Sequence, residues 1–251
     1  MTLANYQTGI KGKKVNEENK ALAGAEYQIF RSDALTTPIE TIDQKGNSQT
    51  TIKTTSAGEF YGKGLSAGQY ILKEVKAPNG YILDTTANKF TIQPESGKPA
   101  ILDLGTFKNY QGKVELTKVD ANNGSEQLAN AEFQLLDTDQ NVVRENLKTN
   151  KTGKLHVANL APGNYYFKET KAPTGYQLSG QLIRFTIDST HSGKPEQVKV
   201  MAKNKLIPQQ PNTPKQGFYP KTGEDKGIVL LVVGAIIILI VMGIAYVRKK
   251  K

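Results

Sequence analysis

The chain has 251 residues and carries 33 Lys and Arg against 23 Asp and Glu, which gives a formal net charge of +10. It contains no Cys and only two His, so disulfides, Cys-ligated zinc, iron–sulfur clusters and thiol catalysis are excluded, and no metal site is expected. The hydrophobic content of 37% is too high for a disordered chain, and the length allows one large or two small domains.

The sequence contains an internal repeat. Residues 67–81, AGQYILKEVKAPNGY, match residues 162–176, PGNYYFKETKAPTGY, at an offset of 95. Upstream, LAGAEY at residues 22–27 matches LANAEF at residues 128–133 at an offset of 106. Self-similarity over a long, fixed spacing indicates that one structural unit occurs twice in the chain.

The two copies differ in length. The change of offset means that the first copy has about eleven more residues between Phe30 and Gly58, and we expect them to form a longer loop or a hairpin. The repeat predicts two tandem domains, the first at residues 1–111 and the second at residues 112–206. Each is long enough to bury its own core.

Each copy consists of short alternating segments separated by Gly, Asn and Pro, which is typical of β-strands. The sequences PNG and PTG, which begin at Pro78 and Pro173, suit turns with Pro at the second position. No long helical period occurs before residue 228, so an all-β fold of two tandem immunoglobulin-like β-sandwiches is predicted. In the second copy the predicted strands are residues 114–118, 132–136, 165–169, 184–187 and 198–202.

Some polar residues of these strands fall on apolar faces. Alternate residues of a strand point to the same side, so Glu169 shares a face with Tyr165 and Phe167. The same spacing directs one Lys, one Glu and one Asn of each copy toward the core, on the first strand, a central strand and the last strand. These residues are Lys14, Glu74 and Asn109 in the first copy and Lys118, Glu169 and Asn204 in the second.

Such a trio has a specific chemistry. A lysine removed from water loses its proton more easily and becomes a nucleophile. A carboxyl group in an apolar pocket stays protonated, polarises the asparagine carbonyl and passes protons to the leaving amine. Attack of the lysine nitrogen on the asparagine side-chain carbon, with loss of ammonia, would join the first and last strands of a domain by an amide bond.

Both copies resemble the Cna B-type domain of Gram-positive surface proteins, a prealbumin-like sandwich. The resemblance rests on a first-strand Lys-Val, on LAGAEY and LANAEF, and on the pattern Tyr-x-x-x-Glu-x-Lys-Ala-Pro-x-Gly-Tyr. It implies isopeptide bonds Lys14–Asn109 and Lys118–Asn204, with Glu74 and Glu169 as their catalytic carboxyl groups. Lys11 and Lys13 lie beside Lys14 and remain alternatives for the first bond.

The sequence after the second domain changes character. Residues 207–218 carry Pro208, Pro211 and Pro214, a three-residue period that matches polyproline II and predicts a stiff wall spacer. Residues 219–251 contain a YPKTG motif, then twenty uncharged residues at 228–247, long enough for a transmembrane helix, and then the basic tail RKKK. The motif consists of Tyr219, Pro220, Lys221, Thr222 and Gly223.

This order of features resembles a sortase sorting signal, although Tyr219 stands where Leu is usual. The resemblance implies cleavage between Thr222 and Gly223 and covalent transfer of Thr222 to peptidoglycan or to a pilin subunit. The protein is then secreted and anchored to the cell wall, and it is membrane-bound only as a precursor. Because residues 1–14 lack the apolar stretch of a signal peptide, we expect this chain to be a fragment or a mature form.

Two functions remain open at this point. The first is a structural stalk or a minor or basal pilin whose cross-linked domains resist force and proteolysis. The alternative is an adhesin that binds a host extracellular-matrix protein or a glycan. We do not expect a turnover enzyme or a cofactor, and the basic residues are too scattered to indicate a nucleic-acid partner.

Overall fold

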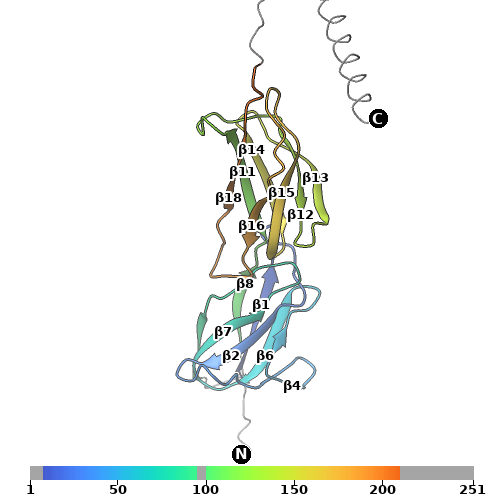
Figure 1. Cartoon of the computed structure of the whole chain (residues 1–251). Helices are drawn as coiled ribbons and strands as arrows, with labels where there is room; N and C mark the ends of the chain where they lie inside the picture. Colours follow the sequence, from blue (N-terminus) through green and yellow to red (C-terminus); the bar gives the residue numbers. More distant parts are fainter. Residues whose placement is uncertain (1–7, 95–99, 210–251) are drawn as a thin grey trace, which may run out of the picture. The chain divides into compact units, whose positions relative to one another are not determined.

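The computed structural model describes residues 8–94 and 100–209 (Figure 1). Within these ranges the chain forms β-strands and no helix, so none of the described segments is a helix that could cross a membrane. The described residues up to 207 belong to one compact unit, which holds both copies of the repeat. The predicted sorting motif, apolar span and basic tail lie outside the described residues.

The first copy forms a sandwich of two sheets. One sheet has the strand order β10-β1-β6-β3-β4, and the other has the order β5-β2-β7-β9. The strands are β1 (Thr8–Val15), β2 (Glu26–Arg31), β3 (Thr41–Ile42), β4 (Ser48–Gln49), β5 (Ile52–Lys53), β6 (Glu59–Leu65), β7 (Gly68–Lys76), β9 (Asn88–Ile92) and β10 (Ile101–Lys108).

The second copy forms a similar sandwich, with the sheets β14-β11-β18 and β13-β12-β15-β16. A short parallel pair joins β8 (Leu83–Asp84) of the first copy to β17 (Thr190–His191) of the second. The other strands are β11 (Gly112–Asp120), β12 (Glu132–Leu136), β13 (Val142–Lys148), β14 (Lys154–Leu160), β15 (Gly163–Lys171), β16 (Ile183–Ile187) and β18 (Val198–Asn204).

In both copies the first strand pairs in parallel with the last strand. Lys14 of β1 lies opposite Phe107 of β10, and Lys118 of β11 lies opposite Ala202 of β18. Each asparagine comes two residues after the residue that faces the lysine. Because side chains alternate along a strand, this register turns the lysine and the asparagine to the same side of the sheet.

Each sandwich encloses its own hydrophobic core. The first core includes Tyr27, Phe60 and Leu72, and the second includes Phe133, Phe167 and other apolar residues of its inner faces. The second core also takes in Ile82 from the first copy, whose side chain is 4% exposed.

Two local expectations needed correction or completion. The extra residues of the first copy include the β3–β4 hairpin, whose turn is closed by hydrogen bonds between Asp43 and Asn47.

In the turn after β7, Tyr81 N–H donates to the Pro78 carbonyl, so Pro78 occupies the first position of the turn and not the second. Pro173 occupies the same position in the second copy, where Tyr176 N–H donates to its carbonyl. The reason is that Gly80, with φ of 80°, supplies the left-handed third position that a type II turn requires.

Candidate covalent cross-linking sites

The first domain brings its predicted trio together. Lys14 Nζ lies 3.1 Å from Glu74 Oε1, and Asn109 Nδ2 donates to Glu74 Oε2 at 2.9 Å. Lys14 comes from β1 in one sheet, Glu74 comes from β7 in the facing sheet, and Asn109 directly follows β10. All three are buried, with exposures of 1%, 7% and 0%. One carboxyl group therefore contacts the lysine with one oxygen and the asparagine with the other.

The second domain repeats this arrangement. Lys118 Nζ lies 2.9 Å from Glu169 Oε1, and Asn204 Nδ2 donates to Glu169 Oε2 at 2.8 Å. These three residues are also buried. The repeat in sequence is thus a repeat in side-chain geometry.

The orientation of each asparagine amide is fixed by a backbone carbonyl. Asn109 Nδ2 donates to the carbonyl of Ile82 at 2.7 Å, and Asn204 Nδ2 donates to the carbonyl of Gln177. A carbonyl only accepts hydrogen bonds, so the nitrogen, not the oxygen, must face it. The glutamate therefore accepts from the nitrogen that would leave and does not contact the asparagine oxygen. The expected polarisation of the asparagine carbonyl by the carboxyl group is not seen, because Asn109 Oδ1 and Asn204 Oδ1 are buried without a hydrogen-bond partner among the described residues.

Backbone N–H groups hold the glutamates in place. Asp84 N–H donates to Glu74 Oε2 at 2.8 Å, and Ser179 N–H donates to Glu169 Oε2 at 2.7 Å. The sequence prediction missed Asp84, Ser179 and the two carbonyl acceptors, because their contribution comes from the main chain. The signal available was a common spacing: Asp84 and Ser179 lie ten residues after their glutamates, and the carbonyl acceptors Ile82 and Gln177 lie eight residues after them.

Burial sets the electrostatics of both sites. Loss of hydration lowers the pKa of Lys14, and the nearby Glu74 carboxyl group opposes this shift without cancelling it. Burial likewise lowers the pKa of Lys118 against the opposing effect of Glu169. Aromatic rings close over the lysine nitrogens, at 5.5 Å for Tyr27 and 5.4 Å for Phe133. The lowered pKa, and not the aromatic rings, which favour the charged form, makes the neutral, nucleophilic amine of both lysines more accessible than that of an exposed lysine.

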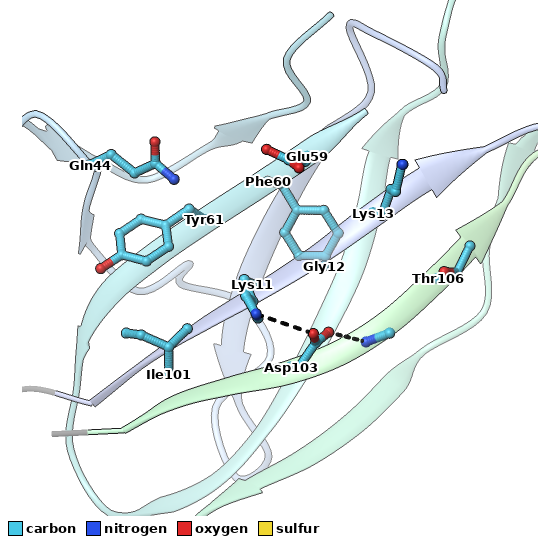
Figure 2. Close-up of a pocket in the computed structure, with 11 residues that line it drawn as sticks. Lys11, Gly12, Lys13, Gln44, Glu59, Phe60, Tyr61, Ile101, Asp103 and Thr106 are labelled. Atoms are coloured by element: carbon cyan, nitrogen blue, oxygen red, sulfur yellow. Dashed lines mark hydrogen bonds and ion pairs between the residues drawn. The ribbon is translucent and has the colours of Figure 1, made fainter. Parts of the chain in front are cut away.

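The structure separates Lys14 from its neighbours. Lys11 forms an ion pair with Asp103 at 3.4 Å, and its side chain is 55% exposed. Lys11 and Lys13 line an open cavity of about 550 Å³ in the first domain. Figure 2 draws the ion pair of Lys11 with Asp103 as a dashed line. Of the three lysines, Lys14 alone is buried against Glu74.

Known families match nearly the whole chain. The model of the SpaA family, which is described as a prealbumin-like fold domain, matches residues 8–104 and again residues 112–204. The LPXTG cell wall anchor motif matches residues 211–251, which include Tyr219, Thr222 and Gly223. No curated protein matches the chain.

Solved structures with similar coordinates include the Bacillus anthracis TIE protein, at 28% identity and a TM-score of 0.47, and a streptococcal ancillary pilin, at 24% and 0.39. The alignments cover 80% and 83% of this chain but only 34% and 65% of those chains. The minor pilin GBS52 of Streptococcus agalactiae is 17% identical, with a TM-score of 0.36 and coverage of 81% of this chain and 98% of that one.

The two family matches cover the described β-sandwiches and the C-terminal segment. They agree with the all-β architecture and with the position of the predicted sorting signal. The chain therefore belongs to the SpaA family of prealbumin-like fold domains and is a secreted protein anchored to the cell wall.

Proposed function

We propose that the chain is a structural subunit of the cell surface, a stalk or a minor or basal pilin, and that an isopeptide bond closes each of its domains. The bonds join Lys14 to Asn109 and Lys118 to Asn204. The observation that carries the proposal is the buried carboxyl group that contacts both the lysine and the asparagine in each domain.

The reaction balances with the groups present. The lysine gives a proton to the glutamate, and its neutral Nζ attacks Cγ of the asparagine. The new Nζ–Cγ bond forms, the Cγ–Nδ2 bond breaks, and the glutamate carries the protons from Nζ to Nδ2. Nζ gives up two protons in all and Nδ2 receives both, so one ammonium ion leaves per bond, the glutamate returns to its ionised state, and the neutral mass of the chain falls by one ammonia. Each site reacts once, so the chain is not a turnover enzyme.

The bonds would stabilise the chain where disulfides are absent. Each links the first and last strands and so closes a loop of nearly a whole domain. By analogy with a disulfide that closes about 100 residues, each stabilises its domain by roughly 4–5 kcal/mol. An amide bond is not broken by thiols, which suits a protein outside the cell.

Wall attachment completes the proposed role. A sortase cleaves between Thr222 and Gly223 and joins Thr222 to peptidoglycan or to a pilin subunit. The anchor motif at residues 211–251 supports this step. The proline-rich spacer at residues 207–218 then separates the two domains from the point of attachment.

Intact-mass measurement of denatured variants tests the bonds. Glu74→Ala and Glu169→Ala each remove one carboxyl group, so each variant should retain the mass of one more ammonia than the unaltered chain, after correction for the substitution. The control is Glu115→Ala, because Glu115 forms an ion pair with Lys154 at 3.0 Å but belongs to neither site. If both glutamate variants still lose two ammonia molecules, the proposed catalytic role is wrong.

A further inference from the structure

The backbone of one short segment supports the first cross-linking site. The Ile82 carbonyl accepts a hydrogen bond from Asn109 Nδ2, and the Asp84 N–H donates to Glu74 Oε2. These two contacts set the position of the leaving nitrogen and of the carboxyl group. The segment from Ile82 to Asp84 is therefore part of the geometry on which the proposed reaction depends.

The second domain holds the same segment from the other side. Leu83 N–H donates to the Ser189 carbonyl and Thr85 N–H donates to the His191 carbonyl, both at 2.9 Å. These bonds alternate with that of Asp84 N–H, so successive N–H groups point to the second domain, to Glu74, and to the second domain again. β8 thus lies between the site and β17.

Two side chains strengthen this attachment. Asp84 Oδ1 accepts a hydrogen bond from Gly193 N–H of the second domain at 3.0 Å. The Ile82 side chain packs in the core of the second domain, together with residues such as Val114 and Ile187. Ile82 and Asp84 therefore contact the first site with their backbones and the second domain with their side chains.

The equivalent segment of the second copy, residues 177–179, lacks such packing against another domain within the described residues. Gln177 and Ser179 make the same backbone contacts to the second site, but the Leu178 side chain between them is 59% exposed. Gln177 is also exposed, whereas its counterpart Ile82 is buried. The first copy therefore has an apolar residue, Ile82, where the second copy has the polar residue Gln177. This difference is expected, because within the described residues no third domain packs on the 177–179 segment.

We propose that the second domain positions the first cross-linking site, and that Ile82 and Asp84 are the positioning residues through which it acts. Docking of β17 on β8 holds the Asn109 amide with its nitrogen on Glu74, and the Lys14–Asn109 bond then forms rapidly. The Lys118–Asn204 bond forms without such help. This inference rests on the proposed isopeptide chemistry and adds that docking of the second domain precedes rapid formation of the Lys14–Asn109 bond.

The test follows both bonds in time on the full chain. The protein is produced by cell-free synthesis, quenched in denaturant at intervals and digested, and the cross-linked peptides of the two sites are measured separately by mass spectrometry. In Asp84→Ala and Ile82→Ala we expect formation of the Lys14–Asn109 bond to slow about tenfold, because each variant removes one anchor of the segment. In Asp84→Ala, which leaves the core of the second domain intact, the Lys118–Asn204 bond should form at its usual rate.

Two matched variants separate positioning from general damage. Asp84→Asn keeps an oxygen that accepts from Gly193 N–H, so it should restore most of the rate. Ser192→Ala removes a hydroxyl contact with Thr86 between the domains but no contact to the 82–84 segment, and it should leave both rates unchanged.

The outcomes distinguish the inference from the proposal beneath it. If the unaltered chain forms neither bond, the isopeptide chemistry itself is wrong. If the unaltered chain forms both bonds and Asp84→Ala and Ile82→Ala form the first at the normal rate, positioning by the second domain is wrong. Equal slowing of both bonds in Asp84→Ala would also contradict it, because the hydrogen bonds of Asp84 go to Glu74, Thr86 and Gly193 and not to the second site.

Discussion

Lys14 is a buried amine whose pKa is lowered by loss of hydration. The free energy of unfolding of a chain without the Lys14–Asn109 bond should therefore depend on pH. In Asn109→Ala the bond cannot form and Lys14 still titrates. Between its lowered folded pKa and the unfolded value of about 10.4, the unfolded chain binds more protons, so the free energy of unfolding rises with pH. We expect Asn109→Ala to become more stable from pH 7 to pH 10, as measured by the urea midpoint.

The linked chain is the control for this measurement. Once Lys14 is part of an amide it no longer titrates, so the unaltered protein should lack this added rise over the same pH range. Other lysines and tyrosines are common to both proteins and cancel in the difference. An identical pH dependence for the two chains would show that Lys14 of the unaltered protein keeps its free amine and is not part of an amide bond.

Much of the candidate site is predictable from the sequence, for a physical reason. Strand alternation and the duplicated motif were sufficient to select Glu74 and Glu169, because a charged residue on a buried face is costly unless it is paired. The sequence left Lys11 and Lys13 open, since register and bulges decide which lysine points inward. It could not reveal the carbonyl of Ile82 or the N–H of Asp84, because any residue type carries these groups.

At the scale of elements, the parallel pairing of first and last strands determines what the bonds can do. β1 pairs with β10, and β11 pairs with β18, so each proposed bond lies between the two strands through which tension enters and leaves a domain. Pulled from its ends, a domain without the bond can only resist through hydrogen bonds and packing. With the bond, the chain between the two linked residues carries no load.

Single-molecule force measurement tests this consequence. In Asn204→Ala the chain from Lys118 to residue 204 becomes extensible, and unfolding should release roughly 30 nm at about 3.4 Å per residue. The unaltered second domain should show no such release. A release of this size from the unaltered chain would contradict a covalent link between Lys118 and Asn204.

The strands themselves were predicted unequally. The five strands predicted for the second copy all appear as β11, β12, β15, β16 and β18, because their buried faces impose an apolar alternation. β13 and β14 were not predicted. Most residues of β13 are exposed and its sequence VVRENLK shows little alternation, and in β14 the alternation breaks at two consecutive exposed residues before Leu160. β3, β4 and β5 have two residues each, too few to carry a periodic pattern.

At the scale of the whole molecule, the features of composition fit a protein of the cell wall. The chain has no Cys, and the proposed amide bonds would provide the covalent closure that disulfides give to many exported domains. The excess of basic residues includes the RKKK tail, which lies beyond the proposed cleavage point. We expect the tail to orient the membrane precursor.

The point of wall attachment can be measured on the native protein. Protein released from the wall by a muralytic enzyme should carry a C-terminal peptide that ends at Thr222 joined to a wall or pilin fragment. Thr222→Ala should leave the chain in the membrane fraction, whereas Thr213→Ala in the spacer should not. Release of a chain that still contains residues 223–251 would contradict sortase cleavage between Thr222 and Gly223.

The central claim is that two buried Lys–Glu–Asn sites become two amide bonds. The most direct test is the intact mass of the unaltered chain, fully denatured and reduced. With both bonds formed, the mass should be lower than that of the sequence by two ammonia molecules, and digestion should give branched peptides that join Lys14 to Asn109 and Lys118 to Asn204. A mass equal to that of the unmodified sequence would contradict it.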